Sequence, residues 1–168
     1  NEKRLAEQGR EIDKINKKLH GFKILKSSEI DIRKNGSLDL KDEALKKLDI
    51  VSVAVHSNFN LSEEEQTERI IRAIKHPLVN ILFHSTGRIL KRRPSYALNM
   101  EKNIKAAKPY KVALEANAFP DRLDLRDGHI RLAVDQKVKL VVNTDAHATE
   151  HLEYLDLGVA QARRGWAK

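Results

Sequence analysis

An acidic residue and a histidine, Asp145 and His147, follow an apolar segment of the chain at 138–142. In an extended chain, two residues separated by one position point to the same side, so both side chains would face one place. Turn formation explains an aspartate after a strand, but it does not explain the histidine. Carboxylate and imidazole groups that face one place are typical ligands of a metal ion. The stretch therefore predicts a metal site where a buried strand ends.

Other predicted strands are followed by side chains of the same two kinds. They are Glu29 after 22–25, His56 after 50–55, His84 after 79–83 and Glu115 near the end of 111–116. Each one alone is more often a surface or hydrogen-bonded residue than a functional one. Their recurrence at successive strand ends is harder to attribute to chance, because ligands of α/β proteins gather at the carboxyl ends of parallel strands. We therefore expect these side chains to share one edge of a sheet.

A rim of histidine and carboxylate ligands predicts metal-assisted hydrolysis. Divalent ions held there polarise a phosphoryl oxygen and lower the pKa of a bound water to about 7. The chain has no cysteine, and the remaining hard or borderline ligands favour manganese, magnesium, zinc or iron. The sequence contains neither a G-x-S-x-G elbow nor a Walker or G-x-G-x-x-G loop, which makes a serine nucleophile or a glycine-rich phosphate loop less attractive.

Predicted strands and helices alternate along the chain. The strands are 22–25, with a continuation into 29–32, then 50–55, 79–83, 111–116 and 138–142. The helices are 2–19, 42–48, 62–75, 98–108, 127–136, 149–155 and 158–166. Ser62 and Glu65 form the capping box that opens one of them. This alternation predicts an α/β fold with a parallel sheet and outer helices, which fits an open sheet and part of a closed barrel.

The bulk composition is that of a folded domain. With 168 residues, of which 40% are hydrophobic and 33% charged, the chain is long enough for one domain with a sizeable core. No apolar stretch approaches the ~20 residues of a membrane span, and the charged, helix-like residues 1–20 are not typical of a signal peptide. We expect a cytoplasmic protein without a membrane partner.

The net charge of +8 and the pI of about 9.7 fit either a solubility bias or a polyanionic partner. Lys91, Arg92 and Arg93 cluster just after His84 and are expected to border the metal rim. A run of charges is usually a solvated loop. Because something cationic must carry a phosphodiester to the ions, we predict that these three residues track a DNA backbone and that Arg88 clamps the reacting phosphate.

Several motifs resemble one known family. They are SEIDI, VAVHSNF, ILFHSTGR, ALEANAFPDRLDL, VVNTDAHATEHL and GVAQARRGW. In order and spacing they resemble the PHP (polymerase and histidinol phosphatase) domain over nearly the whole chain. The closest likeness is to the C-terminal PHP domain of bacterial and archaeal family X DNA polymerases. The resemblance implies a distorted (β/α)7 barrel of the TIM-like type, with up to three metals at its C-terminal rim.

The resemblance also implies roles for individual residues. Glu29 is expected to bridge two metals and to act in catalysis, and His56 and His84 join it on the second metal. Asp145, also expected to be catalytic, would bind the first metal, and His147 would bind the third. The metals would be Mn²⁺ or Zn²⁺, with Fe or Mg²⁺ as further options.

Three further residues are expected beside this centre. Glu115 and Asn117 would lie next to the metal ligands, and Arg88 would face the substrate phosphate. In the polymerases, this domain is similar to manganese-dependent 3′–5′ exonucleases that process DNA ends in repair. That implied activity agrees with the basic charge of the chain.

Part of the family pattern is not found in this sequence. The family opens with a strand bearing His-x-His, whereas this chain begins in the first long helix, and Ser27 and Ser85 replace the usual glycine and proline. We therefore expect residues 1–168 to be a single PHP domain that is N-terminally truncated and lacks its first strands. On this mapping the second metal keeps all its protein ligands, and the fragment is expected to be weakly active or inactive.

Three functions are compatible with these features. The first is a metal-dependent phosphoesterase that processes DNA ends, within a longer protein that carries a polymerase domain. The second is a phosphatase for a small ester such as histidinol phosphate. The third is a catalytically inactive binding or scaffold module. The basic stretch at 91–93 favours the first.

Overall fold

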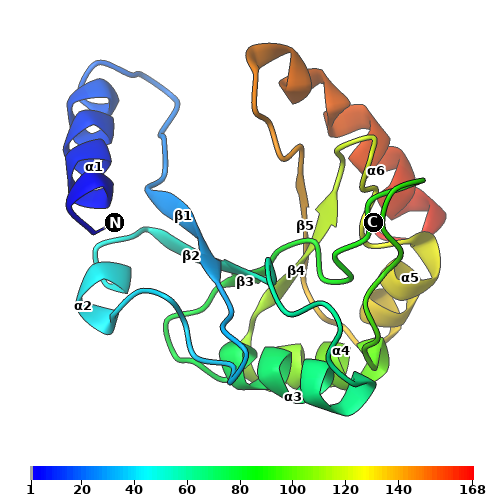
Figure 1. Ribbon diagram of the computed structural model, residues 1–168. Coiled ribbons are helices and arrows are strands. Elements are labelled where there is room, and N and C mark those ends of the chain that lie inside the picture. The colour runs from blue at the N-terminus through cyan, green and yellow to red at the C-terminus, as the bar shows by residue number, and fades with distance from the viewer. Residues whose placement is uncertain (1) are drawn as a thin grey trace.

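The computed structural model describes residues 2–168 as a parallel sheet with helices packed around it (Figure 1). The strands are β1 (Ser27–Asp31), β2 (Ile50–Ala54), β3 (Ile81–Leu82), β4 (Ala113–Asn117) and β5 (Leu140–Asn143). They lie side by side in chain order, and every neighbouring pair is parallel. The predicted α/β fold with a parallel sheet is confirmed.

Helices precede, connect and follow the strands. They are α1 (Glu2–Asn16), α2 (Asp42–Leu45), α3 (Glu63–Ile74), α4 (Met100–Tyr110), α5 (Asp127–Asp135), the 3-10 helix η1 (Thr149–Tyr154) and α6 (Leu155–Arg164). Helix α3 packs on α4, α4 on α5 and α5 on α6, whereas α1 stands apart from them beside β1 (Figure 1). No residue of α1 is buried.

Apolar side chains of the sheet and of the inner helix faces form one core. Val51 and Val53 of β2 belong to it together with Ile70 and Ile74 of α3 and Ile104 of α4. All of them are at most 2% exposed. Burial of these side chains against both layers holds the helices on the sheet, because apolar area removed from water contributes about 25 cal/mol per Å².

The first strand begins later than the sequence predicted. Residues 22–25 form no strand, because the side chain of Asn16 occupies the backbone groups of Ile24. Its Nδ2 donates to Ile24 O and its Oδ1 accepts from Ile24 N, both at 2.8 Å. Phe22 is 69% exposed. The strand forms instead at Ser27–Asp31, overlapping the predicted continuation, and Glu29 therefore lies in the middle of β1.

The sheet is open, since β1 and β5 are its two edges within residues 2–168. Figure 1 shows the two edges diverging, with α1 beside one and α6 beside the other. The arrangement is compatible with part of a TIM-like barrel, whose closure and truncation stay predictions. None of the helices in this range is long and apolar enough to cross a membrane.

Candidate metal centre

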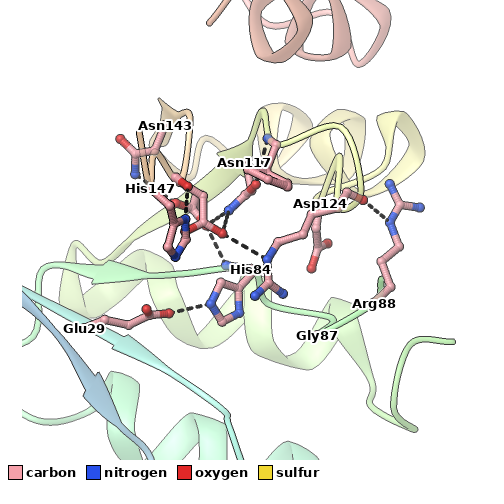
Figure 2. A network of polar contacts seen from close by, with 12 residues as sticks. Glu29, His84, Gly87, Arg88, Asn117, Asp124, Asn143 and His147 are labelled. Carbon is pink, nitrogen blue, oxygen red and sulfur yellow. Dashed lines mark hydrogen bonds and ion pairs between the residues drawn. The ribbon is translucent and has the colours of Figure 1, made fainter. Parts of the chain in front are cut away.

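Three predicted ligands of one metal meet at the carboxyl end of the sheet. Glu29 lies in β1, His56 follows β2 and His84 follows β3. These strands are parallel neighbours, so their carboxyl ends lie side by side. Glu29 Oε1 lies 3.0 Å from His56 Nε2. The same oxygen is also paired with His84 Nε2 (Figure 2). One ligand atom of each residue lies within 4.8 Å of the other two, which confirms the predicted convergence.

The electrostatics of this cluster favour a cation. Burial alone would raise the pKa of Glu29, but hydrogen bonds and charge interactions with His56 and His84 hold that pKa well below its usual range. The hydrogen bond to Glu29 in turn raises the pKa of His56, against the effect of burial. An ionised carboxylate between two imidazoles presents an anionic oxygen and two nitrogens to one place. A divalent ion bound there would replace the protons of these hydrogen bonds.

Glu115 and Asn117 of β4 lie next to His84 and to each other, and their role beside metal ligands stays a prediction. Glu115 is 2% exposed, and its Oε2 accepts hydrogen bonds from His84 N at 2.7 Å and from Asn117 Nδ2 at 3.2 Å. Its Oε1 accepts from Asn143 Nδ2 at 3.0 Å. Burial raises the pKa of Glu115, although these hydrogen bonds oppose the shift. Asn117 Nδ2 also donates to Asp145 Oδ2 at 3.2 Å, so this pair joins the backbone of His84 to the loop after β5.

Asp145 and His147 do not form the extended Asp-x-His pair that the sequence predicted. Asp145 has φ of 53°, a left-handed conformation that turns the chain directly after β5. As a result His147 Nδ1 contacts the backbone oxygen of Asp145 at 2.7 Å, and the His147 side chain is 73% exposed. Neither residue belongs to the group of Glu29, His56 and His84, which is the one potential ligand group found among residues 2–168. Their metal roles stay predictions.

Sequence reasoning missed Asp31, which supports His56. Asp31 Oδ1 accepts a hydrogen bond from His56 N at 3.2 Å and lies 3.4 Å from His56 Nδ1. Asp31 and Glu29 are two positions apart in β1 and therefore share one face of the strand. Had β1 been placed correctly, strand alternation would have predicted that Asp31 faces the same place.

Sequence reasoning also missed Arg122, which pairs with Asp145. Arg122 Nε donates to Asp145 Oδ2 at 3.0 Å, and both side chains are 20% exposed. The Nη1 atom of Arg122 is buried and has no partner within the described chain. Arg122 lies in an irregular loop after β4, where no periodic pattern indicates the direction of a side chain. Its position after a strand end was the available signal.

Arg88 is tied to the same loop. Its Nε donates to Arg122 O at 2.9 Å, and its Nη2 donates to Leu123 O. Figure 2 shows Arg88 on the far side of Gly87 from Glu29. These bonds hold the loop that carries Arg122, and the predicted contact of Arg88 with the reacting phosphate stays a prediction.

The three cations of the basic stretch have different environments. Arg93 is anchored, because its guanidinium lies 4.2 Å from the centroid of the Phe59 ring. Arg92 is exposed and lies 3.7 Å from Asp121. Lys91 is exposed and has φ of 61°. The residues 88–95 line a surface hollow of about 380 Å³, and Lys91 and Arg92 are the two exposed cations of that stretch.

The chain is similar to curated phosphoesterases. A probable phosphatase of Thermoanaerobacter sp. (strain X514) is 36% identical over 142 residues, which cover 79% of this chain and 56% of the relative. A probable phosphatase of Acetivibrio thermocellus is 31% identical over 137 residues, covering 77% of this chain and 54% of the relative. No family model matches the chain.

A further relative is the DNA polymerase/3′-5′ exonuclease PolX of Bacillus subtilis (strain 168). It is 42% identical over 165 residues, which cover 98% of this chain and 29% of the relative. The predicted resemblance to the PHP domain of family X DNA polymerases is confirmed by this similarity. The chain spans less than a third of PolX and about half the length of the probable phosphatases that it matches.

Proposed function

We propose that this chain is a metal-dependent phosphoesterase domain that processes DNA ends, in the manner of a 3′–5′ exonuclease. The observation that carries the proposal is the convergence of Glu29, His56 and His84 at the carboxyl end of the sheet. The similarity to PolX and to probable phosphatases supports phosphoester chemistry. The site's position also agrees, because α/β enzymes gather their catalytic groups at this edge of the sheet.

The donor set fits Mn²⁺ or Zn²⁺. Two imidazole nitrogens and one carboxylate oxygen at about 2.0–2.2 Å from an ion lie roughly 3–4 Å from one another, and the three ligand atoms here all lie within 4.8 Å of one another. A bound ion would act as a Lewis acid toward a phosphoryl oxygen and would lower the pKa of a water. Asp31 and Glu115 accept hydrogen bonds from the backbone N–H groups of His56 and His84 respectively, and Asp31 also lies 3.4 Å from the second ring nitrogen of His56, where it can orient that ring.

The remaining predicted ligands complete this proposal. Asp145 and His147 would contribute to further ions of a centre with up to three metals. In this structure Arg122 Nε donates a hydrogen bond to Asp145 Oδ2. If Asp145 turned to a metal, the guanidinium of Arg122 would be free to bind a phosphate oxygen. In this proposal Arg122 contacts the substrate together with, or in place of, Arg88.

DNA is favoured as the substrate by charge. The chain carries a net charge of +8, and Lys91 and Arg92 are exposed on the loop that follows His84. Contacts of this kind bind a phosphate backbone without regard to sequence. We also propose that a polymerase domain accompanies this domain in the whole protein, and that segments outside this chain close the open sheet into a barrel.

A phosphatase for a small ester is the second candidate. The similarity to the two probable phosphatases favours it. Such an enzyme would use the same metal cluster but would have no need of Lys91 and Arg92. The third candidate, an inactive scaffold, would keep the fold without binding a metal.

The proposal is tested with Mn²⁺ binding, followed by electron paramagnetic resonance, and with hydrolysis of a 3′-labelled single-stranded DNA. Glu29→Gln should weaken Mn²⁺ binding at least about 100-fold and abolish hydrolysis. The matched control Glu153→Gln, at an exposed position of η1, should change neither. Thermal unfolding of each variant reports whether the fold is retained.

The other outcomes separate the candidates. Hydrolysis of p-nitrophenyl phosphate without hydrolysis of DNA would favour the small-ester phosphatase. A wild-type chain that binds no Mn²⁺ and no Zn²⁺ would contradict the metal centre and favour the scaffold.

A further inference from the structure

Four lysines gather at the amino edge of the sheet, where α4 and α5 end and β4 and β5 begin. They line a surface hollow of about 130 Å³, and all four are exposed. We refer to them as the amino-edge lysines: Lys108, Lys111, Lys137 and Lys139. Because the strands are parallel, this edge lies opposite the one that carries the metal cluster, roughly 16 Å away along the five residues of β4.

Two separate helix–strand connections bring these lysines together. Leu114 N donates to Lys139 O at 2.9 Å, so β4 and β5 begin side by side. Helix α4 packs on α5. Lys108 lies in the last turn of α4 and Lys111 directly follows that helix, while Lys137 follows the end of α5. The four cations are therefore carried by regular hydrogen-bonded structure on one edge of the molecule.

The positive charge of this edge exceeds what the protein itself compensates. No acidic residue lines the hollow, and none of the amino-edge lysines forms an ion pair within residues 2–168. The nearest acid in sequence, Asp135, lies 3.0 Å from Arg131 in an ion pair of its own. The carbonyl ends of α4 and α5 supply about half a negative charge each. Four positive charges thus face roughly one negative charge in total.

Two of the lysines occupy positions where glycine would be less strained. Lys111 has φ of 57° and Lys137 has φ of 59°, both in the left-handed region. The residue that follows a helix in this conformation is most often glycine, because a Cβ atom is strained there. The chain therefore places a cation after both helices in spite of the strain. A face that only had to be solvated would not require lysine at these two positions.

We propose that the amino-edge lysines bind the phosphate backbone of a nucleic acid strand, away from the metal cluster. Each ammonium group is a compact point charge that contacts phosphate oxygens without reading a base. Release of counterions from the strand drives such binding, so the affinity does not depend on the base sequence. The choice of nucleic acid among polyanions rests on the proposed DNA substrate, whereas the cationic surface does not. In this role the edge anchors a part of the DNA that lies outside the metal cluster.

The test is a salt titration of oligothymidylate binding by the metal-free chain in the presence of a chelator. The variant combines four substitutions: Lys108→Gln, Lys111→Gln, Lys137→Gln and Lys139→Gln. Its log–log salt slope should be flatter than that of the wild type by about 2–3, because three or four phosphate contacts are lost at about 0.7 each on a single strand. Glutamine adds no backbone strain beyond that of lysine, and thermal unfolding reports whether the fold is retained.

A matched control removes the same charge from α1 and the segment after it. Its substitutions are Lys14→Gln, Lys17→Gln, Lys18→Gln and Lys23→Gln, all at exposed positions. Glu7, Glu11 and Asp13 are interspersed with these control lysines along the chain, so the control should flatten the slope by less than one contact. In acetylation footprinting of the wild type, oligothymidylate should protect the amino-edge lysines and leave the control lysines reactive.

The outcomes separate this proposal from the alternatives. Equal salt slopes of the two variants, or amino-edge lysines that oligothymidylate does not protect, would overturn it. If polyglutamate at the same charge concentration protects these lysines as well as oligothymidylate does, the surface fits an acidic protein partner and the nucleic acid contact is overturned. A wild-type chain that binds oligothymidylate through these lysines, but neither binds Mn²⁺ nor hydrolyses DNA, would support the contact while contradicting the proposed function.

Discussion

At the scale of single residues, the centre depends on a carboxylate oxygen of Glu29 that two imidazoles share. The types of the three converging residues predicted them, and His56 and His84 do follow strands, whereas Glu29 lies within β1 and not after the predicted strand 22–25. Asp31 was missed because the strand that contains it was placed too early. Arg122 was missed for a different reason, since a loop without periodicity gives no indication of where a side chain points. Candidate functional residues that follow a strand could thus be predicted from the sequence, whereas Arg122, in the loop after β4, could not.

Glu115→Gln tests whether the buried carboxylate orients His84. An amide in this place can accept from His84 N, but its NH₂ group would then face the donor group of Asn143. We expect Mn²⁺ affinity to fall about 10–100-fold, as is typical when a residue that supports a metal ligand is changed. Titration of Mn²⁺ by electron paramagnetic resonance measures this. A variant that is folded and binds Mn²⁺ as tightly as wild type would show that Glu115 does not position the ligand.

At the scale of elements, apolar segments and helix signals predicted the strand–helix alternation, and local competition explains the failures. At Ile24, a side chain of α1 takes the backbone groups that a strand would need. At Asp145, a left-handed residue ends the extended chain before His147. Sequence periodicity carries no information about either event. The predicted helix end before Pro109 was also early, because α4 continues to Tyr110 and ends at Lys111, which has φ of 57°.

Ser62→Ala tests the start of α3. The substitution removes the acceptor for Glu65 N and should lower the free energy of unfolding by about 1 kcal/mol. Denaturant unfolding measures the loss. Ser62→Asp keeps an acceptor at the same place and should retain most of the stability. An equal loss in both variants would mean that the hydroxyl contributes through something other than the cap.

His129, in the first turn of α5, should make stability depend on pH. Burial, Arg126 and Arg88 lower its pKa to about 4 in the folded chain, against 6.5 as the ordinary value, while Glu63 is the one acid that lines the cavity beside its ring. Between these two values the unfolded chain binds the extra proton, so the folded state loses stability as the pH falls from 6.5 toward 4. The loss should be on the order of 1 kcal/mol after solvent screening.

Both parts of this expectation can be measured. The His129 ring signals should show no titration above pH 5, and His129→Gln should reduce the pH dependence of the unfolding free energy in this window. A His129 resonance that titrates between pH 6 and 7 would contradict the assignment.

At the scale of the whole molecule, an open parallel sheet presents Glu29, His56 and His84 on one rim, while its edges at β1 and β5 stay unpaired within residues 2–168. Between α1 and the sheet lies a groove of about 260 Å³, lined in part by Leu5, Ile12 and Leu48. The alternation of elements predicted this sheet but not its extent, because alternation is the same in an open sheet and in part of a barrel. The resemblance to a known family supplied the barrel, and its closure stays a prediction.

The charge of the molecule leads to a prediction about DNA. Lys91→Ala with Arg92→Ala should weaken binding of single-stranded DNA at every sequence alike and flatten the log–log salt slope by about 0.7 per lost contact. The matched pair Lys17→Ala with Lys18→Ala, exposed after the end of α1, should leave the slope unchanged. Arg93→Ala should instead lower the stability, because Arg93 packs on Phe59. If the salt slope of DNA binding is unchanged in the variant with Lys91→Ala and Arg92→Ala, these residues belong to a solvated loop without a DNA contact. That result would favour the small-ester phosphatase.

The central claim is that Glu29, His56 and His84 hold one metal ion. The measurement that tests it most directly is an anomalous difference map from crystals of the chain grown with Mn²⁺ or Zn²⁺, recorded at the absorption edge of the metal. The account predicts a peak about 2.0–2.2 Å from Glu29 Oε1, His56 Nε2 and His84 Nε2. A map that shows a fully occupied metal site elsewhere in the molecule, while both rings remain hydrogen-bonded to Glu29, would contradict this claim.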